Sequence, residues 1–110
     1  VFGDGRFVGV VTVTDINSTS DARVKTNVYP IQNPIDKVSQ IQGFSFTWIE
    51  NNKQSMGVIA DEVQKVLPEL VNDSEPKTVN YNGLIGLLIE VVKEQQSQIN
   101  ELNDRISKLE

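Results

Sequence analysis

The chain has 110 residues, a mass of 12.3 kDa and a net charge of −5, which suit one small acidic domain. An acidic surface repels a phosphate backbone, so nucleic acid is not expected as a partner. Cysteine and histidine are absent, which excludes disulfides, zinc sites built from these residues and any imidazole base. A general base in this chain must therefore be Lys, Asp or Glu.

The apolar runs of the sequence are short. The longest, Leu84 to Ile89, includes Gly86 and falls far below the roughly 18 residues that a membrane span needs, so no membrane partner is expected. Neither a phosphate-binding glycine loop nor a metal-ligand spacing occurs, so we expect no cofactor and no metal. Because the chain begins at Val1 without an initiating Met, we expect a piece of a longer polypeptide.

Residues 1–16 are rich in β-branched and aromatic side chains punctuated by glycine. This composition favours a strand at about 6–14. Five polar turn-forming residues follow at 17–21, and such a cluster predicts a boundary between two pieces of architecture.

Short elements are predicted in the middle of the chain. Asn33 before Pro34 is typical of a helix N-cap followed by proline at the first helical position. Phe44, Phe46 and Trp48 alternate with polar residues, which indicates a half-buried strand. The predicted elements are a strand at 24–28, a helix at 34–41, a β-hairpin with strands at 44–49 and 55–60, a helix at about 60–67 and an extended piece at 78–81.

The C-terminal part of the sequence carries a heptad pattern, with Asn82 as a candidate cap at its start. Its apolar positions are spaced alternately by three and four, and the a and d positions are Ile85, Leu88, Val92, Gln95, Ile99, Leu102, Ile106 and Leu109. This pattern predicts a long helix, at about 83–110, that buries a narrow seam by self-association. Additional apolar residues at 84, 87, 89 and 91 widen the apolar face of the first helical turns. This face is broader than a dimer seam needs, and it can equally pack on the globular part. Dimer and trimer both remain open from the pattern.

Several separated motifs stand in one order between about residues 20 and 105. They are Ser20-Asp21-Ala22-Arg23-Val24-Lys25-Thr26-Asn27, Trp48, Gly57-Val58-Ile59-Ala60-Asp61-Glu62-Val63, Pro68-Glu69-Leu70-Val71, Val79-Asn80-Tyr81 and Leu84-Ile85. Together they resemble the peptidase S74 family. Its members are C-terminal intramolecular chaperone auto-processing domains of phage endosialidases, tail fibres and neck appendages, with a relative in the myelin regulatory factor.

The resemblance implies an α+β fold with a small hairpin-based globular part, short helices and a long C-terminal helix in a parallel trimeric coiled coil. Residues 1–19 would be the C-terminal end of an upstream β-structured fibre, and residues 20–110 the chaperone domain. The domain would promote folding and homotrimerisation of the fibre in the same chain and then cut itself off. We expect the fibre in the virion and the chaperone piece to be made in the host cytoplasm and released after cleavage.

The resemblance also implies a site. In the family motif the serine is the nucleophile and the lysine its partner, and these map to Ser20 and Lys25. The scissile bond would join Thr19 to Ser20, and the backbone N–H of Gly57 would serve the oxyanion. The activity implied is that of a serine endopeptidase that cuts its own chain once.

The chemistry of this pair can be argued from the residues as well. Without histidine or metal, a hydroxyl nucleophile needs a lysine that is held neutral by desolvation or a nearby cation. A separation of five is about 140° around a helix and places side chains on opposite faces of a strand, so Ser20 and Lys25 meet only if a turn intervenes. Asp21 is expected to support the site, by shaping that turn or by orienting Lys25.

Two alternatives remain open. Ser20 and Asp21 can be ordinary turn residues and Lys25 a solvated charge, in which case the chain is a non-enzymatic coiled-coil trimerisation module. A membrane-linked transcription-factor relative that frees its own N-terminal part shares the same chemistry, and only the glycine-punctuated, β-rich lead-in favours the phage setting.

Overall fold

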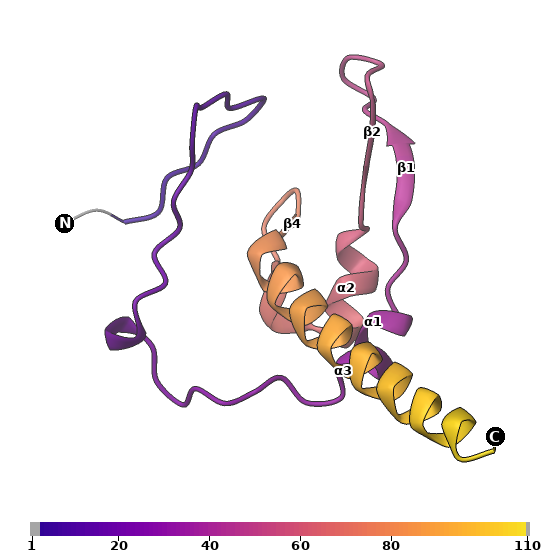
Figure 1. The fold of residues 1–110 in the computed structure, drawn as a ribbon. Coiled ribbons are helices and arrows are strands. Elements are labelled where there is room, and N and C mark those ends of the chain that lie inside the picture. The colour runs from indigo at the N-terminus through magenta and orange to yellow at the C-terminus, as the bar shows by residue number, and fades with distance from the viewer. Residues whose placement is uncertain (1–2, 110) are drawn as a thin grey trace.

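The fold is arranged around one long helix, and the computed structural model describes residues 3–109 (Figure 1). The predicted α+β class is confirmed. The elements in chain order are η1 (Ala22–Val24), α1 (Pro34–Ser39), β1 (Phe44–Thr47), β2 (Gln54–Gly57), α2 (Ala60–Val66), η2 (Pro68–Leu70), β3 (Val71–Asn72), β4 (Thr78–Val79) and α3 (Tyr81–Ser107). The strands form two separate antiparallel pairs, β1 with β2 and β3 with β4.

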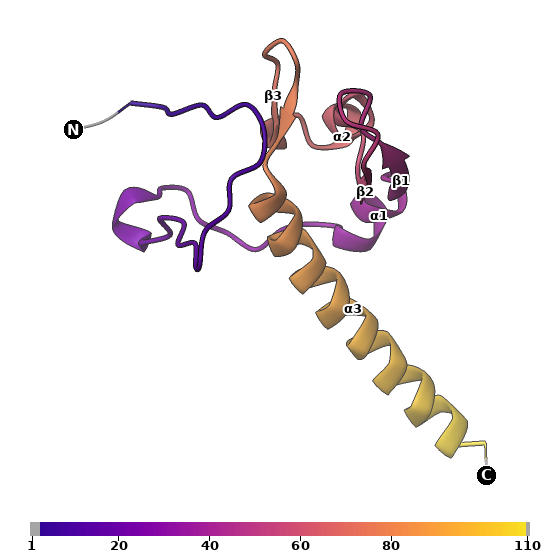
Figure 2. The same ribbon diagram turned by 90° about the horizontal axis from the view of Figure 1, so that it is seen from above.

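Helix α3 confirms the long C-terminal helix. It begins two residues earlier than predicted because Asn80, not Asn82, is its cap, and the Asn80 side chain accepts a hydrogen bond from the Gly83 N–H at 3.3 Å. The helix leaves the globular part and runs on alone to its C-terminal end (Figure 2). Position 110, the end of the predicted helix, lies outside the described residues. Within residues 3–109, no helix combines the length and the apolar character needed to cross a membrane.

The core lies where one face of α3 meets α1, α2 and the residues that follow α2. Val63 is completely buried and Leu87 is 2% exposed, with Leu67 and Val91 also buried beside them. Leu84 and residues of α1 and η2 pack around this cluster. Of the four additional apolar residues in the first turns of α3, Leu84, Leu87 and Val91 therefore pack on the globular part, whereas Ile89 is 55% exposed.

A neighbouring face of α3, which carries the heptad seam, stays open in the single chain. Its apolar a and d side chains are between 49% and 63% exposed over Ile85, Leu88, Val92, Ile99, Leu102 and Ile106. A long helix with a contiguous apolar seam is stable in water only when the seam is covered. The pattern of burial thus separates α3 into an intramolecular face and an unpartnered seam.

The predicted hairpin is confirmed by β1 and β2, which pair in a register that sets Phe44 opposite Gly57 and Thr47 opposite Gln54. The return strand ends at Gly57 and not at residue 60, because α2 already begins at Ala60. The hairpin projects from the helices (Figure 1). The ring of Phe46 in β1 meets the ring of Trp48, which follows the strand, edge to face with centroids 4.9 Å apart.

Two predicted strands are wrong. Residues 3–19 form neither helix nor strand, and apolar side chains such as Phe7 and Val8 are more than 80% exposed. A strand needs a partner for its backbone groups, and the single chain offers none to this segment. The strand predicted at 24–28 does not form, because Val24 ends the η1 turn that Asp21 caps and residues 25–28 form neither helix nor strand.

The predicted helix at 34–41 is confirmed as α1, with Pro34 in its first turn. Its predicted cap is wrong in detail. Asn33 lies before the helix in the left-handed region at φ 52°, and its side chain makes no cap hydrogen bond. Asparagine tolerates this conformation better than most residues, so Asn33 acts as a backbone corner and not as a side-chain cap.

Candidate functional site

A single tight turn brings Ser20 and Lys25 together. The 3-10 turn of η1 is closed by hydrogen bonds from the Val24 N–H to the Asp21 carbonyl and from the Lys25 N–H to the Ala22 carbonyl, both 3.1 Å. The reversal places Lys25 Nζ 2.7 Å from Ser20 Oγ. The intervening turn that a separation of five requires is therefore present.

Asp21 shapes this turn. Its Oδ1 accepts the Arg23 backbone N–H at 2.9 Å, the contact of an Asx turn, and its carboxylate also receives the Arg23 guanidinium at 2.7 to 3.1 Å. The Arg23 side chain, and after it the Arg23 backbone N–H, hold the pKa of Asp21 below its usual value. Sequence reasoning left Asp21 with two roles, and these contacts are those of the turn former.

Arg23 was missed as a supporting residue. The carboxylate of Asp21 raises the pKa of Arg23 in return, and the two side chains form an ion pair at 2.7 Å on the surface of the turn. A signal was available, because a capping aspartate followed two residues later by arginine allows both a backbone and a side-chain contact to the same carboxylate. The pair stiffens the corner that separates Ser20 from Lys25.

The chemistry that this arrangement allows depends on the protonation of one amine. Lys25 Nζ donates to Ser20 Oγ, and both side chains lie in exposed residues. A charged lysine has three donors and no acceptor, so it cannot take a proton from the hydroxyl. Once neutral, the same amine at the same distance is within reach for general-base transfer.

The segment before Ser20 is attached to the helix core by a side chain that sequence reasoning treated only as a cap. Asn82 Nδ2, in the first turn of α3, donates to Ser18 Oγ at 2.9 Å. Thr19 lies between this anchored serine and Ser20. No local pattern could have found the contact, because the two residues are 64 positions apart.

Gly57 lies elsewhere in the single chain. It ends β2, and both views place the hairpin and the η1 turn apart, with the first turns of α3 between them (Figures 1 and 2). A Cβ at Gly57 would come within 2.7 Å of the Tyr81 hydroxyl, which accepts the Val58 N–H at 3.4 Å. Glycine at this position gives Tyr81 room to approach the backbone. One copy of the chain does not bring Gly57 to Ser20.

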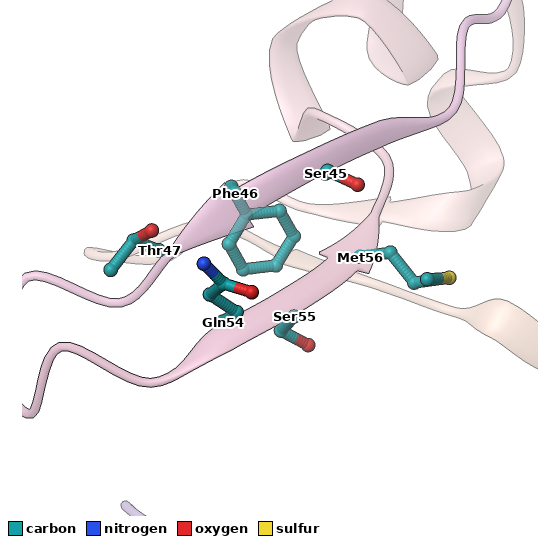
Figure 3. A pocket seen from close by; sticks show the side chains of 6 residues that line it. All are labelled: Ser45, Phe46, Thr47, Gln54, Ser55 and Met56. Atoms are coloured by element: carbon teal, nitrogen blue, oxygen red, sulfur yellow. The ribbon is translucent and has the colours of Figure 1, made fainter.

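The surface of the described residues carries several hollows. One of about 340 Å³ is lined by side chains from both strands of the hairpin (Figure 3). The six residues are Ser45, Phe46, Thr47, Gln54, Ser55 and Met56. In the part of the chain that the structure describes, no group of three or more carboxylate, histidine or cysteine side chains is placed to hold a metal ion.

Comparisons with known proteins give one family match and relatives that are phage tail fibre proteins. A family model, peptidase S74, described as chaperone of endosialidase, matches residues 20–72, and this confirms the predicted resemblance. The long tail fiber protein Gp37 of Salmonella phage S16 is 34% identical over 92% of this chain and 15% of its own length. The proteins of the same name from Escherichia phage AR1 and Enterobacteria phage K3 are 36% and 30% identical over 74% and 87% of this chain.

The chain is short beside these relatives. It covers 15% of the Salmonella phage S16 protein, 9% of the Enterobacteria phage K3 protein and 8% of the Escherichia phage AR1 protein. The match to the family model begins at Ser20, the residue whose hydroxyl lies beside Lys25.

Proposed function

We propose that this chain, which over residues 20–72 belongs to the peptidase S74 family, is the intramolecular chaperone of a phage tail fibre and cuts itself from that fibre. In this proposal it promotes folding and homotrimerisation of the upstream fibre and then cleaves the Thr19–Ser20 bond. The observation that carries the proposal is the 2.7 Å contact between Lys25 Nζ and Ser20 Oγ across the η1 turn.

The proposed cleavage uses two residues of one chain. Ser20 Oγ attacks the carbonyl carbon of Thr19, and neutral Lys25 takes the hydroxyl proton. As the new C–O bond forms, the bond from the Thr19 carbon to the Ser20 nitrogen breaks, and Lys25 returns the proton to that amine. Water then hydrolyses the ester, leaving a carboxylate on Thr19 and restoring the Ser20 hydroxyl. Each chain is cut once, so the enzyme has no turnover on other substrates.

Assembly would supply the water-excluded surroundings of Lys25 that the single chain lacks. Lys25 is exposed to water in one copy of the chain. We propose that neighbouring copies pack around the η1 turn and exclude water, and desolvation disfavours the charge on a lysine. Cleavage would then wait until the copies are together, which suits a chaperone that leaves when folding is complete.

The exposed seam of α3 supports the association step. Its a and d side chains lie on the face that the globular part does not cover. The parallel homotrimer in this proposal comes from the family resemblance, since the seam alone fits two or three strands. Three aligned copies raise the local concentration of upstream β segments, whose non-local pairing is otherwise slow and prone to aggregation.

The oxyanion donor requires a second copy. Because Gly57 lies apart from Ser20 within one chain, its N–H can serve the Thr19 oxyanion only when it comes from a neighbouring subunit. The proposed active site is then complete only in the assembly. This arrangement gives the same order of events as the desolvation of Lys25, with cutting after association.

The proposed location follows from the relatives, which are phage tail fibre proteins. The fibre would enter the virion, and the chaperone piece, made in the host cytoplasm, would be released after cleavage.

A denaturing gel of the chain expressed with its upstream segment tests the proposal. We expect two bands from the wild type and one uncut band from Ser20→Ala and from Lys25→Ala. Ser39→Ala and Lys37→Ala are the matched controls, because both positions lie in α1, away from the η1 turn, and should cleave like the wild type. An intact wild-type chain in the assembled particle would refute self-cleavage.

The second candidate is a permanent, non-enzymatic trimerisation module. The exposed seam of α3 favours it as much as the autoprotease, because both functions need the copies to associate. The same gel separates the two candidates, since the module gives a single intact band in the wild type.

A further inference from the structure

The segment that carries the scissile bond is held to the rest of the molecule by few contacts. Residues 18–25 are all exposed, and no residue of the η1 turn is buried. Among the described residues, one side-chain hydrogen bond reaches this segment from the helix core, the 2.9 Å bond from Asn82 Nδ2 to Ser18 Oγ. Farther upstream, the Arg6 guanidinium approaches the Glu75 carbonyl at the longer distance of 3.5 Å.

The hydrogen bonds inside the η1 turn do not fix the position of the Thr19 carbonyl. Asp21, Arg23 and Lys25 fix the nucleophile relative to its base, and all their hydrogen bonds run between residues 20 and 25. None of them touches the Thr19 carbonyl, which must come within about 3–3.5 Å of Ser20 Oγ in a productive orientation. The placement of that carbonyl depends on what holds the chain on its N-terminal side.

The Asn82 side chain holds the chain at Ser18, one residue before Thr19. We propose that Asn82 is a positioning residue for the self-cleavage, which fixes Ser18 so that the Thr19 carbonyl is presented to Ser20. Only Thr19 lies between the anchored Ser18 and the turn that holds Ser20, so few backbone torsions remain free there. The inference rests on the proposed function, and it gives a role to a residue that touches neither the reacting atoms nor Lys25.

The anchor is rigid because the first turn of α3 is itself fixed by packing. Asn80 caps the Gly83 N–H, and a Cβ at Gly83 would overlap the Leu70 side chain, so this turn sits tightly against η2. The same helix continues into the seam through which copies would associate. Asn82 thus links the scissile bond directly to the helix proposed to assemble, and a shift of α3 on association would be passed to Ser18.

The test is a double-mutant cycle on the rate of self-cleavage in the full chain with its upstream segment. Asn82→Ala and Ser18→Ala should each slow the appearance of the cut band about fivefold, a factor that corresponds to about 1 kcal/mol of barrier. The double variant should be no slower than either single variant, because both remove the same hydrogen bond. Asn82→Asp should retain most of the rate, since its carboxylate can accept from the Ser18 hydroxyl.

Two controls separate positioning from loss of structure. In a Ser20→Ala background, Asn82→Ala should leave the oligomeric mass and the thermal unfolding midpoint unchanged. Asn100→Ala, which removes a comparable exposed asparagine contact on the distal part of α3, should cleave at the wild-type rate.

The outcomes separate failure of the inference from failure of the proposed function. A wild type that never cuts overturns the proposed function. A wild type that cuts, with Asn82→Ala equally fast or with single effects that multiply in the double variant, overturns only the role of Asn82. Loss of assembly in step with the loss of rate would likewise show a structural role and overturn the inference.

Discussion

The packed core and the cleavage turn of this molecule are held by different forces. In the core, Val63 and Leu87 are almost fully buried between α2 and α3, so apolar burial stabilises that part of the fold. In the turn, residues 20–25 bury nothing and are held by hydrogen bonds that run between near neighbours. The core is therefore held by apolar burial, whereas the turn is held only by local hydrogen bonds.

This difference means that the turn sets the distance between Ser20 and Lys25 but does not by itself make the lysine a base. Ser20 and Lys25 reach hydrogen-bonding distance within a single chain, because Asp21 and Arg23 close the corner between them. A water-excluded environment, which would neutralise the lysine, is missing from that same chain. We infer that the distance is encoded locally and that the reactivity comes from neighbouring copies.

The largest expected effect comes from a change that keeps the charge and removes the base. Arginine stays protonated at any ordinary pH, so Lys25→Arg should retain a cation beside Ser20 and lose self-cleavage completely. The assay is the two-band gel, and Lys37→Arg is the matched control. A cut Lys25→Arg chain would show that the lysine is a structural contact and not a base.

A charge in the seam of α3 should give the next largest effect. Ile99→Asp places a carboxylate at an a position that is half exposed in one chain, and we expect the copies to separate and cleavage to slow by at least about tenfold. Light scattering and the gel are read on the same sample. Ser97→Asp, at an outward position two residues earlier, should change neither, and a dissociated Ile99→Asp chain that cuts at full rate would disconnect cutting from assembly.

A cavity in the core should lower stability without touching the turn. Leu87→Ala removes a side chain that is 2% exposed, and it should reduce the free energy of unfolding by about 2–5 kcal/mol. Val24→Ala, in the exposed η1 turn, should change it by less than about 0.5 kcal/mol. Urea unfolding of both variants at one protein concentration makes the comparison, and equal losses would contradict the division between core and turn.

The smallest expected effect is the pH dependence of an ion pair at the edge of the core. Lys77 Nζ lies 2.6 Å from Asp61, which joins the β3–β4 connection to α2. The hydrogen bond and charge of Lys77 lower the pKa of Asp61 below its ordinary value of 3.8. The hydrogen bond from Asp61 raises the pKa of Lys77 above 10.5, with a further contribution from the charge of Asp73.

The directions of these two pKa shifts define the pH range in which the ion pair stabilises the fold. A lowered carboxyl pKa stabilises the fold above its unfolded value and loses this contribution as pH falls through the folded value. A raised amine pKa stabilises the fold below its unfolded value and loses the contribution as pH rises through the folded value. Asp61→Asn should therefore flatten the loss of stability below about pH 4, measured by thermal unfolding, with Glu101→Gln as the control. Identical acid limbs in wild type and Asp61→Asn would contradict the pair's contribution.

Much of the fold was predictable because its signals are local. The alternation of Phe44 and Phe46 gave the hairpin, and the heptad spacing gave α3, since both patterns fix a face without help from distant residues. The strand expected at 6–14 did not form, because the strands that would pair with it belong to no part of the described chain. Sequence could not show this, as β-branched composition reports propensity and not partners.

The candidate site likewise combines contacts that a short segment of sequence predicts with one that depends on distant residues. Spacing alone kept Ser20 and Lys25 apart on either a helix or a strand unless a turn intervened, and only the family motif suggested that they meet. The turn that joins them depends on Asp21 and Arg23, whose contact is readable from a short segment. The anchor from Asn82 to Ser18 depends on the packing of α3 against the core and was beyond any local pattern.

The most direct test is the intact mass of the fragments recovered after the chain, with its upstream fibre, has assembled. The proposed function predicts a C-terminal fragment that begins at Ser20, together with an upstream fragment that ends in the carboxylate of Thr19. An assembled wild-type chain of undivided mass, or fragments that meet at any other bond, would contradict it.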